Sequence, residues 1–74
     1  RNLDVNKMTL AENLLQLRKA RKLTQTEAAE AIGIVMRTYR RYEMGEREPV
    51  ASILIKMADF YGVTIDYLVG RADK

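Results

Sequence analysis

The sequence predicts an all-α fold of five short helices, and three observations support this prediction. Apolar residues recur three or four positions apart along most of the chain, which is the spacing of one helix face. Threonines and glycines stand where these segments begin and end. No segment shows the alternating pattern of a strand, and there is no internal repeat. A chain of 74 residues forms one small domain, so we expect a compact core without a large cavity.

Two helices are predicted to begin with capping boxes. In this motif a Thr side chain accepts from the backbone amide three residues later, and a Glu at that position reaches back to the Thr amide. Thr9 precedes a first helix from about Leu10 to Arg21, and Thr24 precedes a second helix that ends at Ile32. The capping glutamates are Glu12 and Glu27, and the inner faces carry Leu10, Leu14, Leu17, Ala28, Ala29 and Ile32.

Gly33 ends the second helix, because glycine tolerates the left-handed backbone of a tight turn. A third helix must follow at once, and we place it from Val35 to Met44. Tyr39 and Tyr42 are three positions apart and are predicted to face the core rather than to stack on bases. A short helix, a tight turn and a second helix with long polar donors form a helix-turn-helix, which places side chains in a DNA major groove. The other face of the third helix carries Arg37, Arg40, Arg41 and Met44.

Two further helices complete the predicted domain. Gly45 closes the third helix, and a connector runs from there to Pro49. A fourth helix ends at Gly62, and Thr64 caps a fifth. The apolar residues assigned to these helices are Leu54, Met57, Ala58, Tyr61, Val63, Ile65 and Leu68.

The net charge of +3 is spread unevenly along the chain. Residues 18–41 carry seven basic and two acidic side chains, a net charge of +5, whereas residues 42–74 carry four basic and six acidic ones, a net charge of −2. A basic run is often only a solvated helix face. This one coincides with the predicted helix-turn-helix, so it favours a polyanionic partner.

The composition excludes several classes of protein and site. Without Cys or His the chain has no disulfide, thiolate nucleophile, imidazole base or common zinc site. The carboxylates are scattered, so we expect no enzyme, cofactor, metal or small-molecule ligand. The longest branched-aliphatic run, Ile53 to Ile55, is too short for a membrane span, and no signal peptide is recognised, so we expect a cytoplasmic protein. We expect residues 1–8 to form a flexible arm, 9–70 the domain, and 71–74 a frayed end or the start of a linker.

Taken together, these motifs resemble the lambda-repressor-like helix-turn-helix domains of the Cro/C1 or XRE type. The resemblance runs from Leu14 to Leu68. It implies a compact five-helix domain of a transcriptional regulator, with repression favoured, that binds double-stranded DNA. It further implies a homodimer on a palindromic operator, with a recognition helix of about residues 35–44 in the major groove. The matching motifs are Leu23-Thr24-Gln25, Ala28 to Gly33, Arg41-Tyr42-Glu43, Gly45, Pro49, Tyr61-Gly62-Val63 and Asp66-Tyr67-Leu68.

The resemblance also implies roles for individual residues. Arg37 is the first choice for reading guanine, because an Arg donates two parallel bonds to O6 and N7. Arg18 and Glu43 are expected to form a structural ion pair. Arg47 has acidic neighbours, which weaken its assignment. The base-reading candidates are Met36, Arg37, Arg40 and Arg41, of which Arg40 and Arg41 are also open to phosphate contact, and the phosphate candidates are Thr24, Gln25, Tyr42 and Arg47.

Departures from the family pattern keep a second function open. Val35 and Val50 stand where a Ser or Thr usually caps a helix, and Met36 replaces a polar base reader. Apolar side chains at such positions favour either a homodimer contact or a protein-interaction module, such as an antitoxin or anti-repressor partner. The apolar residues that motivate this alternative are Val35, Met36, Met44, Val50 and Ile55.

Overall fold

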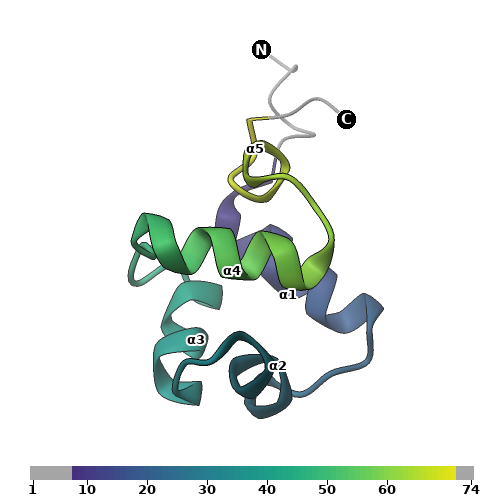
Figure 1. Cartoon of the computed structure of the whole chain (residues 1–74), viewed down its shortest axis with the longest axis vertical. Coiled ribbons are helices and arrows are strands. Elements are labelled where there is room, and N and C mark those ends of the chain that lie inside the picture. The colour runs from purple at the N-terminus through teal and green to yellow at the C-terminus, as the bar shows by residue number, and fades with distance from the viewer. Residues whose placement is uncertain (1–7, 72–74) are drawn as a thin grey trace.

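The computed structural model describes residues 8–71, and within that range the chain forms five helices and no strand, which confirms the predicted all-α fold. Residues 1–7 and 72–74, which include most of the predicted arm and frayed end, lie outside the described residues. The α4 helix crosses the middle of the view in Figure 1, with α2 and α3 on one side of it and α5 on the other. The helices are α1 (Leu10–Ala20), α2 (Gln25–Ile32), α3 (Met36–Glu43), α4 (Ala51–Tyr61) and α5 (Ile65–Leu68).

Both predicted capping boxes are present. The Thr24 hydroxyl accepts from the Glu27 amide at 3.0 Å, and the Glu27 carboxylate accepts from the Thr24 amide at 2.8 Å. Thr9 caps α1 in the same way, and the Thr64 hydroxyl caps α5. The N-cap residues of α3 and α4 are Val35 and Val50, and no described side chain caps either helix. The backbone amides at these two ends therefore lack the stabilisation that α1 and α2 have.

All five helices contribute buried apolar residues to one core. Tyr39 and Tyr42 are buried, as their spacing predicted, and the Tyr39 and Tyr61 hydroxyls are hydrogen-bonded at 2.7 Å, which joins α3 to α4. Ile65, which was expected to supply an apolar contact, is 38% exposed, and Leu68 is the fully buried residue of this four-residue helix. The buried apolar residues are Leu14, Ala28, Ala29, Ile32, Tyr39, Tyr42, Met57, Ala58, Tyr61 and Leu68.

One buried polar residue connects the two ends of the domain. Asn13 of α1 is only 5% exposed, and its amide nitrogen donates to the carbonyl oxygens of Tyr67 and Leu68, each at 3.1 Å. The last carbonyls of a helix have no partner within the helix. Asn13 therefore satisfies the end of α5 and fixes it against α1.

We expect Asn13→Asp to lower the free energy of unfolding by at least about 2 kcal/mol, because a carboxylate has no donor for the two carbonyls and becomes an unsatisfied buried charge. Urea unfolding followed by circular dichroism measures this loss. The control is Gln16→Glu, which makes the same charge change at an exposed site of α1 and should cost no more than about 0.5 kcal/mol. Equal losses in the two variants would contradict the role of Asn13.

Candidate nucleic-acid interface

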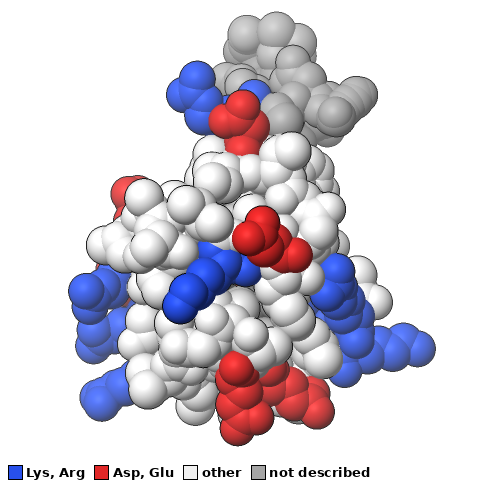
Figure 2. All heavy atoms as spheres, in the orientation of Figure 1, with Lys and Arg blue, Asp and Glu red and all other residues white. Residues whose placement is uncertain are grey.

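The α3 helix has one face in the core and one in solvent. Tyr39 is 0% and Tyr42 5% exposed, and these two tyrosines hold the helix in place. Figure 2 shows Lys and Arg side chains gathered beside α3, on the left of the view, and acidic side chains at the bottom over α2. The exposed face of α3 carries all four predicted base readers, Met36, Arg37, Arg40 and Arg41.

The turn between α2 and α3 sets the position of that face. Gly33 has a φ of +94°, in the left-handed region, and its amide donates to the Ala29 carbonyl at 2.8 Å. The Ile34 amide donates to the same carbonyl at 3.0 Å, so the chain reverses within two residues of α2. Ala28 and Ala29 are buried, and their small side chains let a neighbouring helix come close. The structure therefore has the helix-turn-helix geometry that the sequence predicts.

The Glu43 carboxylate at the end of α3 joins three helices. Arg18 of α1 donates from Nε to Oε2 at 2.6 Å and from Nη2 to Oε1 at 3.0 Å, which is a bidentate ion pair. The third guanidinium nitrogen of Arg18 donates to the Leu23 carbonyl at 2.9 Å. Gln25, the first residue of α2, donates from Nε2 to Glu43 Oε1 at 3.0 Å. The side chains of Arg18 and Glu43 are 14% and 3% exposed, so the pair is largely shielded from water.

Burial and hydrogen bonding shift the pKa values of this cluster. Burial on its own would raise the pKa of Glu43, but the hydrogen bonds from Arg18 and Gln25 outweigh it, and the net pKa is lowered. The hydrogen bond to Glu43 raises the pKa of Arg18. Burial raises the pKa of Tyr39 and that of Tyr61, so both tyrosines stay neutral. The ion pair is thus charged at neutral pH.

The four phosphate candidates differ in their exposure and in the hydrogen bonds that they already make within the domain. Thr24 uses its backbone amide and a hydroxyl lone pair in the capping box. Gln25 is partly exposed and bonded to Glu43. Tyr42 is buried with the core, whereas Arg47 is exposed in the connector, between two exposed glutamates. The structure therefore places Gln25 and Arg47 nearer to solvent than Tyr42.

Two arginines of the basic block of residues 18–41 bond to other parts of the domain. Arg18 is committed to Glu43, and Arg21 donates from Nη1 to the Phe60 carbonyl at 2.8 Å. The Arg21 guanidinium also lies over the rings of Phe60 and Tyr61, 5.2 and 5.5 Å from their centroids. Figure 2 shows basic side chains on both flanks of the view, beside α3 and beside the end of α1. Arg18 and Arg21 thus bond to other parts of the domain, whereas the arginines of α3 are exposed.

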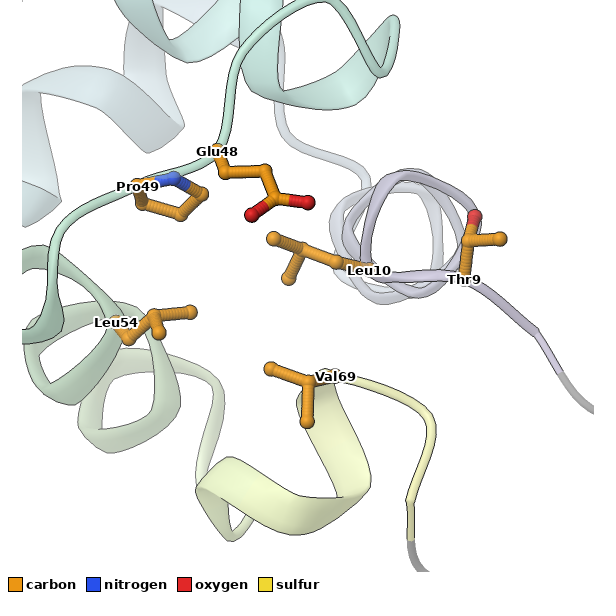
Figure 3. A pocket seen from close by; sticks show the side chains of 6 residues that line it. All are labelled: Thr9, Leu10, Glu48, Pro49, Leu54 and Val69. Atoms are coloured by element: carbon orange, nitrogen blue, oxygen red, sulfur yellow. The ribbon is translucent and has the colours of Figure 1, made fainter.

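A shallow depression lies away from α3, between the start of α1, the connector, α4 and the end of α5. Figure 3 shows its lining, which is mostly apolar with one carboxylate, that of Glu48. None of the predicted DNA-contacting residues lines it. The lining residues are Thr9, Leu10, Glu48, Pro49, Leu54 and Val69.

The described part of the chain has neither a membrane-spanning helix nor a cluster of metal-ligating side chains. None of its helices has the length and apolar character needed to cross a membrane. Within residues 8–71 no group of three or more acidic side chains lies close enough to hold a metal ion.

The fold and the α2–α3 geometry define a helix-turn-helix domain, and the chain belongs to the helix-turn-helix family, whose model matches residues 14–68. The predicted resemblance to the Cro/C1 type is thereby confirmed. The chain is 42% identical over 62 residues to YobD of Bacillus subtilis, an uncharacterized HTH-type transcriptional regulator. The matched region covers 84% of this chain and 55% of YobD. The chain is also 42% identical over 64 residues to RstR of Vibrio cholerae, the transcriptional repressor of the cryptic phage CTXphi, covering 86% of this chain and 57% of RstR.

A solved structure shows the same fold. The P22 c2 repressor, crystallised with a synthetic operator, superposes with a TM-score of 0.83 at 22% identity, over 88% of this chain and 98% of that one. The two proteins therefore share the arrangement of their helices. The chain spans a little over half the length of YobD and RstR.

The lowered pKa of Glu43 predicts an acid-sensitive contribution to stability. An unfolded Glu43 carboxyl, with its ordinary pKa of 4.5, takes up a proton at a pH where the folded carboxyl is still ionised. The contribution is therefore complete above that value and is lost as the pH falls through the lower folded pKa. Urea unfolding at a series of pH values should show a steeper loss below about pH 5 in the wild type than in Arg18→Met/Glu43→Leu, which lacks the pair. Parallel pH curves would contradict the shift.

Proposed function

We propose that this chain is the DNA-binding domain of a transcriptional regulator, with repression favoured over activation, and that α3 reads base pairs in the major groove. The observation that carries the proposal is the exposed face of α3, which presents three guanidiniums opposite the buried tyrosines and follows α2 through a tight turn. RstR is named a repressor, and the P22 c2 repressor was crystallised with operator DNA. Such a role needs no catalysis or cofactor, and it places the protein in the cytoplasm with the DNA.

The position of each side chain on α3 suggests its role. Arg37 lies in the first turn, and residues near the start of a recognition helix contact base edges. We assign it to a guanine, with two bonds to O6 and N7. Met36, which is 40% exposed, suits apolar contact with a thymine methyl. Arg40 and Arg41 lie in the last turn and divide between bases and phosphates.

We assign phosphate contact chiefly to the start of α2. Gln25 is its first residue, and a helix amino terminus attracts anions through its free amides and its dipole. The Thr24 hydroxyl still has a proton to donate, and Arg47 adds a charge from the connector. Tyr42 is the weakest of the four candidates, because little of it is exposed.

We further propose that the protein binds a palindromic operator as a homodimer, with half-sites about one helical turn apart. Exposed apolar side chains favour a contact with another protein surface. They suit a dimer, and they equally suit the alternative function, a protein-interaction module such as an antitoxin or anti-repressor partner. The exposed residues concerned are Val35, Met36, Met44, Val50 and Ile55.

We expect Arg37→Ala to reduce the free-energy difference between binding the preferred base pair and a substituted one by about 1–3 kcal/mol, because one bidentate guanine contact is lost. Duplexes selected from a random pool supply the operator, and fluorescence anisotropy with the selected and the singly substituted duplex measures the preference. Lys56→Ala is the matched control, since it removes the same charge from an exposed site on α4. If Arg37→Ala keeps the base preference of the Lys56→Ala control, Arg37 does not read that base pair.

The dimer and the alternative function are separated by mass in solution. Sedimentation of the protein with the selected duplex should give two chains for each palindrome. A defined complex with one chain would overturn the dimer but keep DNA binding. A wild-type protein that enriches no sequence from the pool and shifts no duplex would overturn DNA binding and favour the protein-interaction module.

A further inference from the structure

Glu43 also bears on how DNA is held, because its contacts reach the proposed phosphate anchor. Oε1 of Glu43 accepts from two donors at the same distance of 3.0 Å, Arg18 Nη2 and Gln25 Nε2. These donors belong to α1 and α2, and Glu43 is the last residue of α3. The carboxylate therefore links the start of α2 to the reading helix.

The chemistry of the carboxylate fixes which end of the Gln25 carboxamide faces it. An ionised carboxylate only accepts hydrogen bonds, so Gln25 must present its nitrogen to Glu43. That nitrogen carries two hydrogens, of which the bond to Glu43 uses one. A phosphate oxygen is also purely an acceptor. The orientation that Glu43 imposes is thus the one that leaves an amide hydrogen for a phosphate.

Charge and burial are compatible with this arrangement. A bare carboxylate near a phosphate would repel it, but Glu43 is neutralised by the bidentate bond from Arg18. The Glu43 side chain is almost fully buried, whereas Gln25 is partly exposed. DNA would therefore meet the amide of Gln25 at the edge of the cluster and not the carboxylate.

We propose that Glu43 is a positioning residue for phosphate recognition, which holds the Gln25 carboxamide so that one hydrogen bonds Glu43 and the other bonds a DNA phosphate. This inference rests on the proposed DNA-binding function. Its physical basis is preorganisation: a side chain already held in its bound orientation loses less conformational freedom when the ligand arrives.

The test is a coupling experiment. Arg18→Met/Glu43→Leu removes both charges together, which leaves the net charge unchanged and no lone buried ion. Gln25→Ala is measured in the wild type and in this double variant, with the selected duplex. We expect Gln25→Ala to weaken binding about tenfold in the wild type, the size of one hydrogen bond to a charged group, and much less in the double variant. The base preference should stay the same in all four proteins, since Gln25 contacts no base.

The outcomes separate the inference from the function on which it rests. If Gln25→Ala costs the same in both backgrounds, Glu43 does not position Gln25 and the inference is wrong, while DNA binding stands. If the wild type binds no selected duplex, the proposed function itself is wrong. Circular dichroism checks that the double variant is folded.

A second measurement needs no substitution. In the ¹⁵N-labelled wild type, addition of the selected duplex should shift one of the two side-chain amide protons of Gln25 and leave the other near its position in free protein. Shifts of both protons by similar amounts, or of neither, would overturn the inference even if the double variant does not fold.

Discussion

The ion pair between Arg18 and Glu43 is the interaction on which the geometry of the helix-turn-helix depends. A lone carboxylate with so little access to water would be costly, and here both of its oxygens accept from one guanidinium. The same guanidinium also donates to the Leu23 carbonyl, just before α2. Buried pairs of this kind add little net stability, but they tolerate few alternative arrangements. The pair therefore fixes α1, the start of α2 and the end of α3 relative to one another.

The α3 helix has two tasks, and its sequence separates them by face. The Tyr39 hydroxyl bonds to Tyr61 within the core, so the buried face is held by a directional contact as well as by packing. The opposite face is free to carry arginines, because none of the core depends on it. The weak point is the start of the helix, where Val35 supplies no side-chain cap. The position of α3 thus rests on tertiary contacts more than on its own termini.

Spacing rules predicted contacts between residues close in the chain. Of the side-chain contacts between distant segments, only the Arg18–Glu43 pair was expected, and that came from the family resemblance. The capping boxes at Thr9 and Thr24 depend on residues three positions apart, and both are present. No sequence pattern marks the role of Asn13, because its two partners lie 54 and 55 positions further along the chain. Arg21 was counted with the basic block for the same reason, since its carbonyl partner, Phe60, lies on α4. The bond between Gln25 and Glu43 was also missed, and no sequence signal marks it.

The attachment of α5 has a mechanical consequence. This helix is a single turn, too short to persist alone, and it is held by one buried leucine and by the amide of Asn13. Asn13 belongs to the same helix as Arg18, little more than one turn away. A displacement of α5 is thereby coupled through Asn13 to α1, whose Arg18 guanidinium orients the start of α2.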